Sequence, residues 1–241
     1  MNPGLILSSK HLNILSKLIK RRQKGEPIAY ILGYKDFMGL RFKVNKNVLI
    51  PRPETEGIIE RLKDLRFKDY KQPVRILDIG TGSGCIAVSL AKQFLIFNFQ
   101  FLITASDISS SALKVAKQNA KAHKAKINFI KSDLLKNIKF VPDIIIANLP
   151  YVPKKIYDLR YKDLKFEPEE ALVDPVKDFN IYERLLKQIS ALPSLPKAIF
   201  LEIDPTAKKY VINYVINYIP KAKIKFYKDF NNLWRFVEIT T

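Results

Sequence analysis

A polar amide ends an apolar run in the stretch DIIIANLPYVP, residues 143–153. The side-chain oxygen of Asn148 and the main-chain carbonyl of Leu149 are two acceptors that can hold both hydrogens of a planar NH₂ group. Tyr151 can lie against the flat face of that group, and Pro150 stiffens the turn. Such a nitrogen is a poor nucleophile because its lone pair is delocalised, so fixing its position favours attack on an activated carbon. We predict that these four residues are catalytic, although a strand-end Asn in a Pro turn also occurs without function.

The second candidate site is the turn DIGTGSG, residues 78–84, in a chain that has only eight glycines. Small residues between a strand and a helix let the backbone approach a ligand, and the free N–H groups of the helix point toward it. The spacing is G-x-G-x-G rather than the G-x-G-x-x-G of dinucleotide sites. It is closer to an S-adenosylmethionine loop, with a tight turn that binds nothing as the alternative. The predicted cofactor-binding residues here are Gly80, Thr81, Gly82, Ser83 and Gly84.

Two acidic residues follow the next two predicted strands. Asp107 is placed to accept hydrogen bonds from both ribose hydroxyls of a nucleoside cofactor, although it also fits a helix cap. Asp133 is placed to reach the adenine amino group, with Leu134 against the ring, and a simple loop acid is the alternative for Asp133. Asn148 is expected beside the sulfonium, so it counts as cofactor-binding too. No metal is expected, since the sulfonium is already activated and the two histidines lie far apart in the sequence.

The candidate site residues lie between strand-like and helix-like segments that alternate from residue 75 onward. This alternation predicts an α/β fold with a parallel sheet. The predicted strands are 75–80, 101–107, 126–131, 143–148 and 197–203, and a closing hairpin joins 223–229 to 234–239. The predicted helices are 83–93, 109–123, 181–192 and 205–218, and residues 150–176 are expected to be a loop. A helix around residues 12–19 that stops at Gly25, then a small hairpin within 37–50, precedes this pattern. We predict a short N-terminal region, 1–50, and a main domain, 51–241.

Composition narrows the class of protein. The chain has 241 residues, 47% of them hydrophobic, which permits a substantial core. The longest apolar stretch, residues 94–103, is too short to cross a bilayer, and a secretory pattern is missing. One cysteine fits a reducing cytosol, so we expect a cytoplasmic protein without membrane contact. The net charge of +19 favours anionic partners such as RNA or ribosomal complexes, with compositional drift as the alternative.

A resemblance to a known family rests on longer segments. NLPY is similar to the Asn-Pro-Pro-Tyr motif of amino-methyltransferases, with Leu149 in place of the first Pro. RRQKGEPIAYILGYKDFMGLRFKVNKNVLIPRPETE, residues 21–56, closely resembles the release-factor glutamine methyltransferases known as PrmC or HemK. Further matches are DIGTGSGCIAVSLA, ASDISSSALKVAKQNA, FEPEEAL and KDFNNLWRFVEI. The resemblance covers about residues 18–241.

This resemblance implies a Rossmann-like class I methyltransferase with a seven-stranded, mostly parallel sheet behind a small helical N-terminal domain. It implies methyl transfer from S-adenosylmethionine to the Gln of the Gly-Gly-Gln motif of peptide chain release factors. IPRPETE would shape the pocket wall, although Pro53 with Glu54 and Glu56 also suits an ordinary helix start. The chain departs from the family in a shortened N-terminal region, in VDPVKD after AL, and in Leu149. Because adenine-N6 DNA and RNA methyltransferases share the NPPY-type motif, they remain the alternative, and a non-catalytic binding module is a third.

Overall fold

The computed structural model describes residues 8–94, 99–174, 176 and 178–241. Its N-terminal part holds α1 (Ser9–Gln23), α2 (Ile28–Leu32) and the hairpin β1 (Tyr34–Phe37) and β2 (Leu40–Lys43). The strands that follow are β3 (Val74–Ile79), β4 (Phe101–Asp107), β5 (Asn128–Lys131), β6 (Ile144–Asn148), β7 (Ala198–Glu202), β8 (Lys223–Lys228) and β9 (Trp234–Thr240). The helices among them are α3 (Glu56–Lys63), α4 (Cys85–Gln93), α5 (Ser110–Ala122), α6 (Lys154–Leu159), α7 (Tyr161–Leu164), α8 (Asn180–Ser190) and α9 (Lys208–Tyr218).

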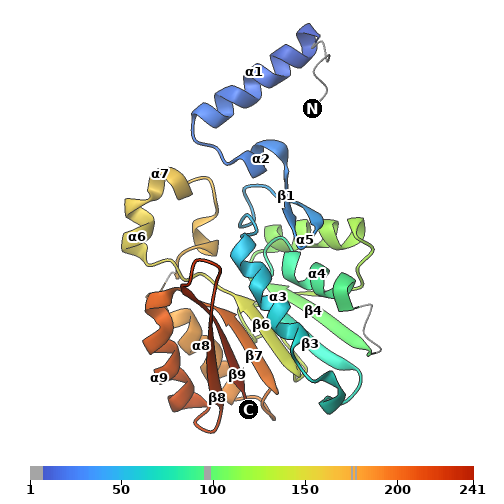
Figure 1. Cartoon of the computed structure of the whole chain (residues 1–241), viewed down its shortest axis with the longest axis vertical. Helices are drawn as coiled ribbons and strands as arrows, with labels where there is room; N and C mark the ends of the chain where they lie inside the picture. The colour runs from blue at the N-terminus through green and yellow to red at the C-terminus, as the bar shows by residue number, and fades with distance from the viewer. Residues whose placement is uncertain (1–7, 95–98, 175, 177) are drawn as a thin grey trace.

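The main sheet has seven strands in the order β5-β4-β3-β6-β7-β9-β8, and β9 runs antiparallel to both of its neighbours. Helices α3 and α4 lie over one face, while α8 and α9 cover the other (Figure 1). This arrangement confirms the predicted α/β fold with a mostly parallel seven-stranded sheet.

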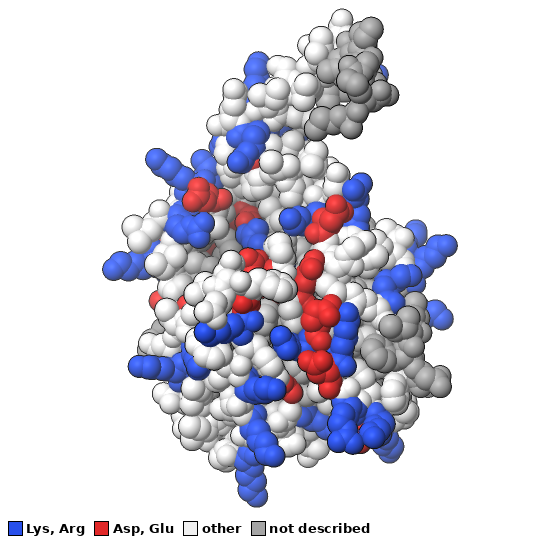
Figure 2. Space-filling view, in the orientation of Figure 1, with Lys and Arg blue, Asp and Glu red and all other residues white. Residues whose placement is uncertain are grey.

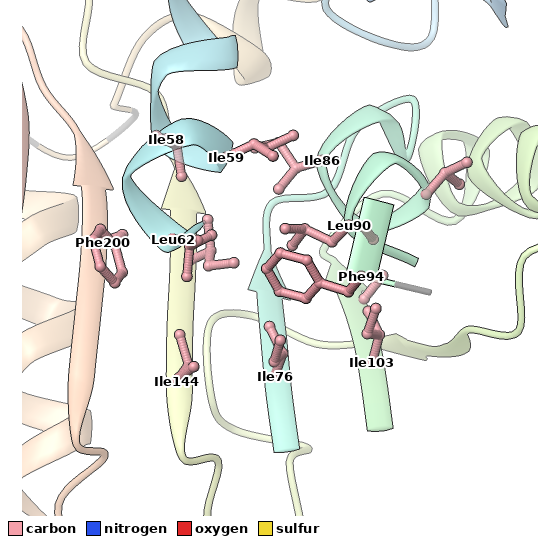
Figure 3. Packing of buried hydrophobic residues seen from close by; sticks show 14 of the residues in the cluster. Ile58, Ile59, Leu62, Ile76, Ile86, Leu90, Phe94, Ile103, Ile144 and Phe200 are labelled. Carbon is pink, nitrogen blue, oxygen red and sulfur yellow. The ribbon is translucent and has the colours of Figure 1, made fainter. Parts of the chain in front are cut away.

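Side-chain alternation explains why the central strands read as continuous apolar runs. Successive residues of a strand point to opposite faces, so a strand covered on both faces is apolar throughout. Ile76 and Ile144 join the cluster under α3 and α4, where Ile59, Leu62 and Leu90 pack on them, as Figure 3 shows. Leu77 and Ile145, the next residues along, join the cluster under α8 and α9, and all these side chains are buried.

The N-terminal elements follow the expected pattern. The predicted first helix is α1, which Ser8 caps, and Gly25 follows its end with a φ of 91°. The hairpin docks on α5, because the side chain of Asn119 accepts from the Lys43 N–H at 2.8 Å and donates to the Lys43 carbonyl at 3.0 Å. Asn119 also donates to the Ser83 carbonyl, which joins the hairpin to the glycine turn. The boundary near residue 50 stays a prediction.

One expectation was wrong in detail, because the predicted loop over 150–176 contains α6, α7 and a 3₁₀ turn at Glu169–Ala171. Helices of four to six residues are too short to show a periodic apolar pattern, so they could not be predicted from the sequence. Residues 95–98 of the apolar stretch considered for membrane crossing lie outside the described residues. Within the described ranges, none of the helices has the length and apolar character needed to cross a membrane.

Candidate active site

The candidate site is a cavity of about 330 Å³ at the carboxyl ends of the central strands, within the range of small-molecule sites. Strand β3 pairs with β4 on one side and with β6 on the other, so the order in which successive strands are added to the sheet reverses at β3. In open α/β sheets ligands bind at this switch point. The lining residues used below are Pro51, Arg52, Thr55, Gly80, Thr81, Gly82, Ser83, Asp107, Asp133, Leu134, Asn148, Leu149, Pro150, Glu170 and Arg184.

Close contacts and left-handed backbone explain the glycines of the turn. Gly80, Gly82 and Gly84 have φ values of 70°, 54° and 81°, a region that favours glycine. A Cβ on Gly84 would lie 3.1 Å from the Cβ of Ala116, and one on Gly80 would lie 3.1 Å from the side chain of Leu149. Gly80 and Gly82 therefore line the cavity without a side chain, whereas Gly84 lies outside the described lining and allows α4 to pack closely against Ala116.

Asp78, just before the turn, is fully buried, and its Oδ2 accepts a hydrogen bond from the Thr81 hydroxyl at 2.6 Å. Its Oδ1 has no partner among the described residues. Burial raises the pKa of Asp78 to about 7, against the hydrogen bond from Thr81. Asp78 is absent from the described cavity lining, so its carboxyl group supports the glycine turn through Thr81 rather than facing a ligand.

Asp107 lines the cavity at the end of β4 and is itself mostly buried. Its Oδ2 accepts from the Gly82 N–H and its Oδ1 from the Ser109 N–H, both at 2.9 Å. Burial raises the pKa of Asp107, and these two backbone donors oppose the shift. The carboxylate thus ties the glycine turn to β4, and each oxygen keeps a lone pair for a further donor such as a ribose hydroxyl.

Asp133 and Leu134 also line the cavity, and Leu134 is buried. Arg184 of α8 donates to both oxygens of Asp133 at 2.8 Å, and Lys136 donates to Oδ2 at 2.7 Å. Burial raises the pKa of Asp133, but the hydrogen bonds and charges of Lys136 and Arg184 outweigh it and leave the pKa below its usual value. Arg184 could not be predicted as a partner of Asp133, because it lies 51 positions further along the chain.

Asn148 ends β6 at the cavity, and both hydrogens of its amide are already used. Its Nδ2 donates to Oγ1 of Thr55 at 3.1 Å and to Oε2 of Glu202 at 3.0 Å. Neither partner was identified from the sequence, although an acid inside the apolar strand AIFLE was a visible signal. The Asn148 Oδ1 has no donor among the described residues, so this oxygen stays available to a ligand.

The other three motif residues separate into two groups. Leu149 and Pro150 line the cavity, and the Leu149 side chain is 4% exposed within the core under α8 and α9. Tyr151 is absent from the described cavity lining, and its hydroxyl donates to Oε1 of Glu202 at 2.8 Å. Burial and the nearby Glu202 raise the pKa of Tyr151 well above its usual value, so the phenol stays protonated.

Two segments far apart in sequence close the wall of the cavity. Pro51, Arg52 and Thr55 come from the IPRPETE segment, and Glu170 comes from the FEPEEAL segment. The buried Glu167 joins them, since Oε2 accepts from the Ile50 N–H at 3.0 Å and Oε1 from Arg52 at 2.5 Å. The predicted role of IPRPETE as pocket wall matches the position of these residues.

Comparison with solved structures identifies the fold. The catalytic domain of human METTL16 in complex with a MAT2A 3′UTR hairpin aligns with a TM-score of 0.66 at 15% identity, covering 84% of this chain and 76% of that one. A ribosomal protein L11 methylase from Lactobacillus delbrueckii aligns with a TM-score of 0.57 at 17% identity, covering 80% of each chain. The fold is that of the class I methyltransferases.

Sequence comparison gives the family. Residues 1–33 match the PrmC N-terminal domain and residues 58–162 the methyltransferase small domain. The release factor glutamine methyltransferase of Dictyoglomus turgidum is 35% identical over 97% of this chain and 82% of its own length. The Staphylococcus aureus protein of the same name is 33% identical over 91% and 77%. The chain belongs to the release factor glutamine methyltransferase family. It spans 65% of the length of its Lactococcus lactis relative, which is 39% identical over 76% of this chain.

Proposed function

We propose that the protein transfers a methyl group from S-adenosylmethionine to the side-chain amide of the Gln in the Gly-Gly-Gln motif of peptide chain release factors. The observation that carries the proposal is the fixed amide of Asn148. Its two hydrogens are bound by Thr55 and Glu202, so its oxygen remains as an acceptor beside the Leu149 carbonyl. Two acceptors of this kind suit the two hydrogens of a primary amide.

The cofactor proposal rests on the cavity itself. S-adenosylmethionine supplies a methyl group that is activated by a positively charged sulfur. The turn residues Gly80 to Ser83, which line the cavity, and Asp107 would hold it, with Leu134 against the adenine ring. Asp133 already pairs with Arg184, so its contact with the adenine amino group would use a remaining lone pair.

The chain's own residues contribute position and polarity. The Asn148 oxygen and the Leu149 carbonyl would aim the glutamine nitrogen and stabilise the positive charge that develops on its hydrogens. The nitrogen would form the new bond to the methyl carbon as the bond between that carbon and sulfur breaks, and it would then release one proton to solvent, which restores a neutral amide. Tyr151, which lies outside the described cavity lining, would support the turn through its hydrogen bond to Glu202.

The alternative is adenine-N6 methylation of DNA or RNA, because an exocyclic amine also presents two hydrogens in a plane. The charge of the chain suits nucleic acid, and Figure 2 shows Lys and Arg spread over most of the visible face, with Asp and Glu gathered in a strip over α3. This spread-out charge favours general attraction to anionic surfaces, including proximity to the ribosome in the cytoplasm.

The test offers purified protein and labelled S-adenosylmethionine to three acceptors: a release factor, the same factor with its motif Gln replaced by Glu, and nucleic acid. We expect label only in the unaltered release factor, at the Gln, as located by mass spectrometry of the motif peptide. The Glu variant is the matched control, since it keeps the docking surface and removes the amide. Label that enters nucleic acid alone would overturn the proposal.

A further inference from the structure

A carboxylate at the end of β7 accepts hydrogen bonds from two residues of the NLPY motif. Glu202 is 1% exposed and lies directly across from Asn148 in the β6–β7 pairing. Its Oε2 accepts from Nδ2 of Asn148 at 3.0 Å, and its Oε1 accepts from the hydroxyl of Tyr151 at 2.8 Å. A buried carboxylate is costly unless it is hydrogen-bonded, so these contacts offset its burial.

The chemistry of a carboxylate makes this contact directional. An ionised carboxylate only accepts hydrogen bonds, so the amino half of the Asn148 amide must face it. If the amide were flipped, Oδ1 would face Oε2 and the amino group would face the substrate nitrogen, which needs an acceptor. Thr55 supports the same orientation, because its Oγ1 accepts the second amide hydrogen at 3.1 Å.

Several neighbouring groups act on the pKa of the Glu202 carboxyl group. Burial raises the pKa of Glu202, whereas the hydroxyls of Thr55 and Tyr151 and the positive charge of Arg235 oppose that shift. Arg235 is in turn held by Asp229, with Nε at 3.0 Å from Oδ2. These donors and the nearby cation limit the effect of burial, and the pKa of Glu202 stays above its usual value.

We propose that Glu202 is the positioning residue of the site, which locks the Asn148 amide with its oxygen toward the substrate. The inference rests on the proposed function for its reaction, and Glu202 touches neither substrate nor cofactor. It acts through Asn148, so its removal must cost nothing further once Asn148 is gone.

The test is a double-mutant cycle in single-turnover methyl transfer. Glu202→Met fills similar volume without acceptors and should lower the rate by about 10²-fold, the order seen when one preorganised transition-state hydrogen bond is lost. Glu202→Gln has one acceptor oxygen for two donors and should lower it by about tenfold. In an Asn148→Ala background both substitutions should change the rate less than threefold. The dissociation constant of S-adenosylmethionine should stay within about threefold throughout.

Tyr182→Phe is the matched control, since the Tyr182 hydroxyl donates to the main-chain carbonyl of Glu202 at 2.8 Å and leaves the carboxylate alone. It removes a buried hydrogen bond from the same residue, and we expect a rate within about threefold of the unmodified protein. A loss equal to that of Glu202→Met would mean that damage to β7, rather than the amide orientation, explains the effect.

A second readout needs neither substrate nor cofactor. In ¹⁵N spectra the side-chain NH₂ protons of Asn148, assigned by their loss in Asn148→Ala, should exchange slowly with water and do so at least tenfold faster in both Glu202 variants. Unchanged exchange, full activity of either variant, or losses that persist in the Asn148→Ala background would each overturn the inference. If the protein methylates nucleic acid instead, the same cycle on that acceptor still tests Glu202, so the two proposals fail separately.

Discussion

Replacing Leu149 by Pro separates the side chain from the main chain at the acceptor carbonyl. The proposed role of Leu149 uses its carbonyl alone, which any residue supplies. Among the described residues, none accepts a hydrogen bond from the Leu149 N–H, so the missing donor of proline removes no bond. Asn148 lies in β6 and is extended, the conformation that a residue before proline prefers.

The cost of Leu149→Pro should fall on stability rather than on the reaction. The Leu149 side chain is 4% exposed, and its Cδ2 would lie 3.1 Å from a Cβ on Gly80. Proline removes about one buried carbon, worth about 1–2 kcal/mol with the small void that it leaves. For a domain of this size the melting temperature should fall by roughly 2–8 °C. The rate of methyl transfer should stay within about tenfold, equal to roughly 1.4 kcal/mol in the barrier.

Single-turnover transfer to a release factor, with a thermal melt of each variant, measures both effects. Leu149→Ala is the companion variant, because it removes more side chain without restricting the backbone. It should melt lower than Leu149→Pro at a similar rate of transfer. A folded Leu149→Pro protein that loses more than about a hundredfold in rate would refute the reasoning, since the side chain would then shape the site itself.

Three further changes test the cofactor site and the surface. Asp107→Ala should weaken S-adenosylmethionine binding about 10- to 100-fold, or roughly 1.5–3 kcal/mol, and unchanged affinity by calorimetry would contradict the assignment. Because the pKa of Asp78 is raised to about 7, its protonated carboxyl group contributes stability at low pH that is lost as pH rises through 7. Asparagine does not titrate, so the unfolding free energy of Asp78→Asn should rise by roughly 3 kcal/mol relative to that of the unmodified protein as pH goes from 5 to 8. Replacing Lys17, Lys20 and Lys24 by Glu should slow methylation of a whole release factor, most at low salt, and an unchanged salt dependence would indicate compositional drift.

The sequence predicted what depends on local pattern. The glycine turn, Asp107 and Asn148 could be placed at one edge of the sheet because each follows an apolar strand of typical length. The partners of Asn148 could not be predicted, since Thr55 lies 93 positions and Glu202 54 positions away along the chain. Such pairs depend on strand order and register, which no local periodicity encodes. Tyr151 was expected against the substrate amide, and its hydrogen bond to Glu202 likewise became visible only in three dimensions.

The contact of Glu167 with Ile50 and Arg52 limits which segments can be exchanged between relatives in an engineered protein. A buried charge that loses its partner costs about 3–5 kcal/mol, a large part of the stability of a domain. We therefore expect that the IPRPETE and FEPEEAL segments can be exchanged with those of a relative only as a pair. In a chimera that takes residues 44–55 from a relative with a different residue at position 52, the cavity wall should be restored only when residues 165–172 come from the same parent. The two segments should therefore be treated as one unit in protein engineering, although more than a hundred residues separate them in the chain.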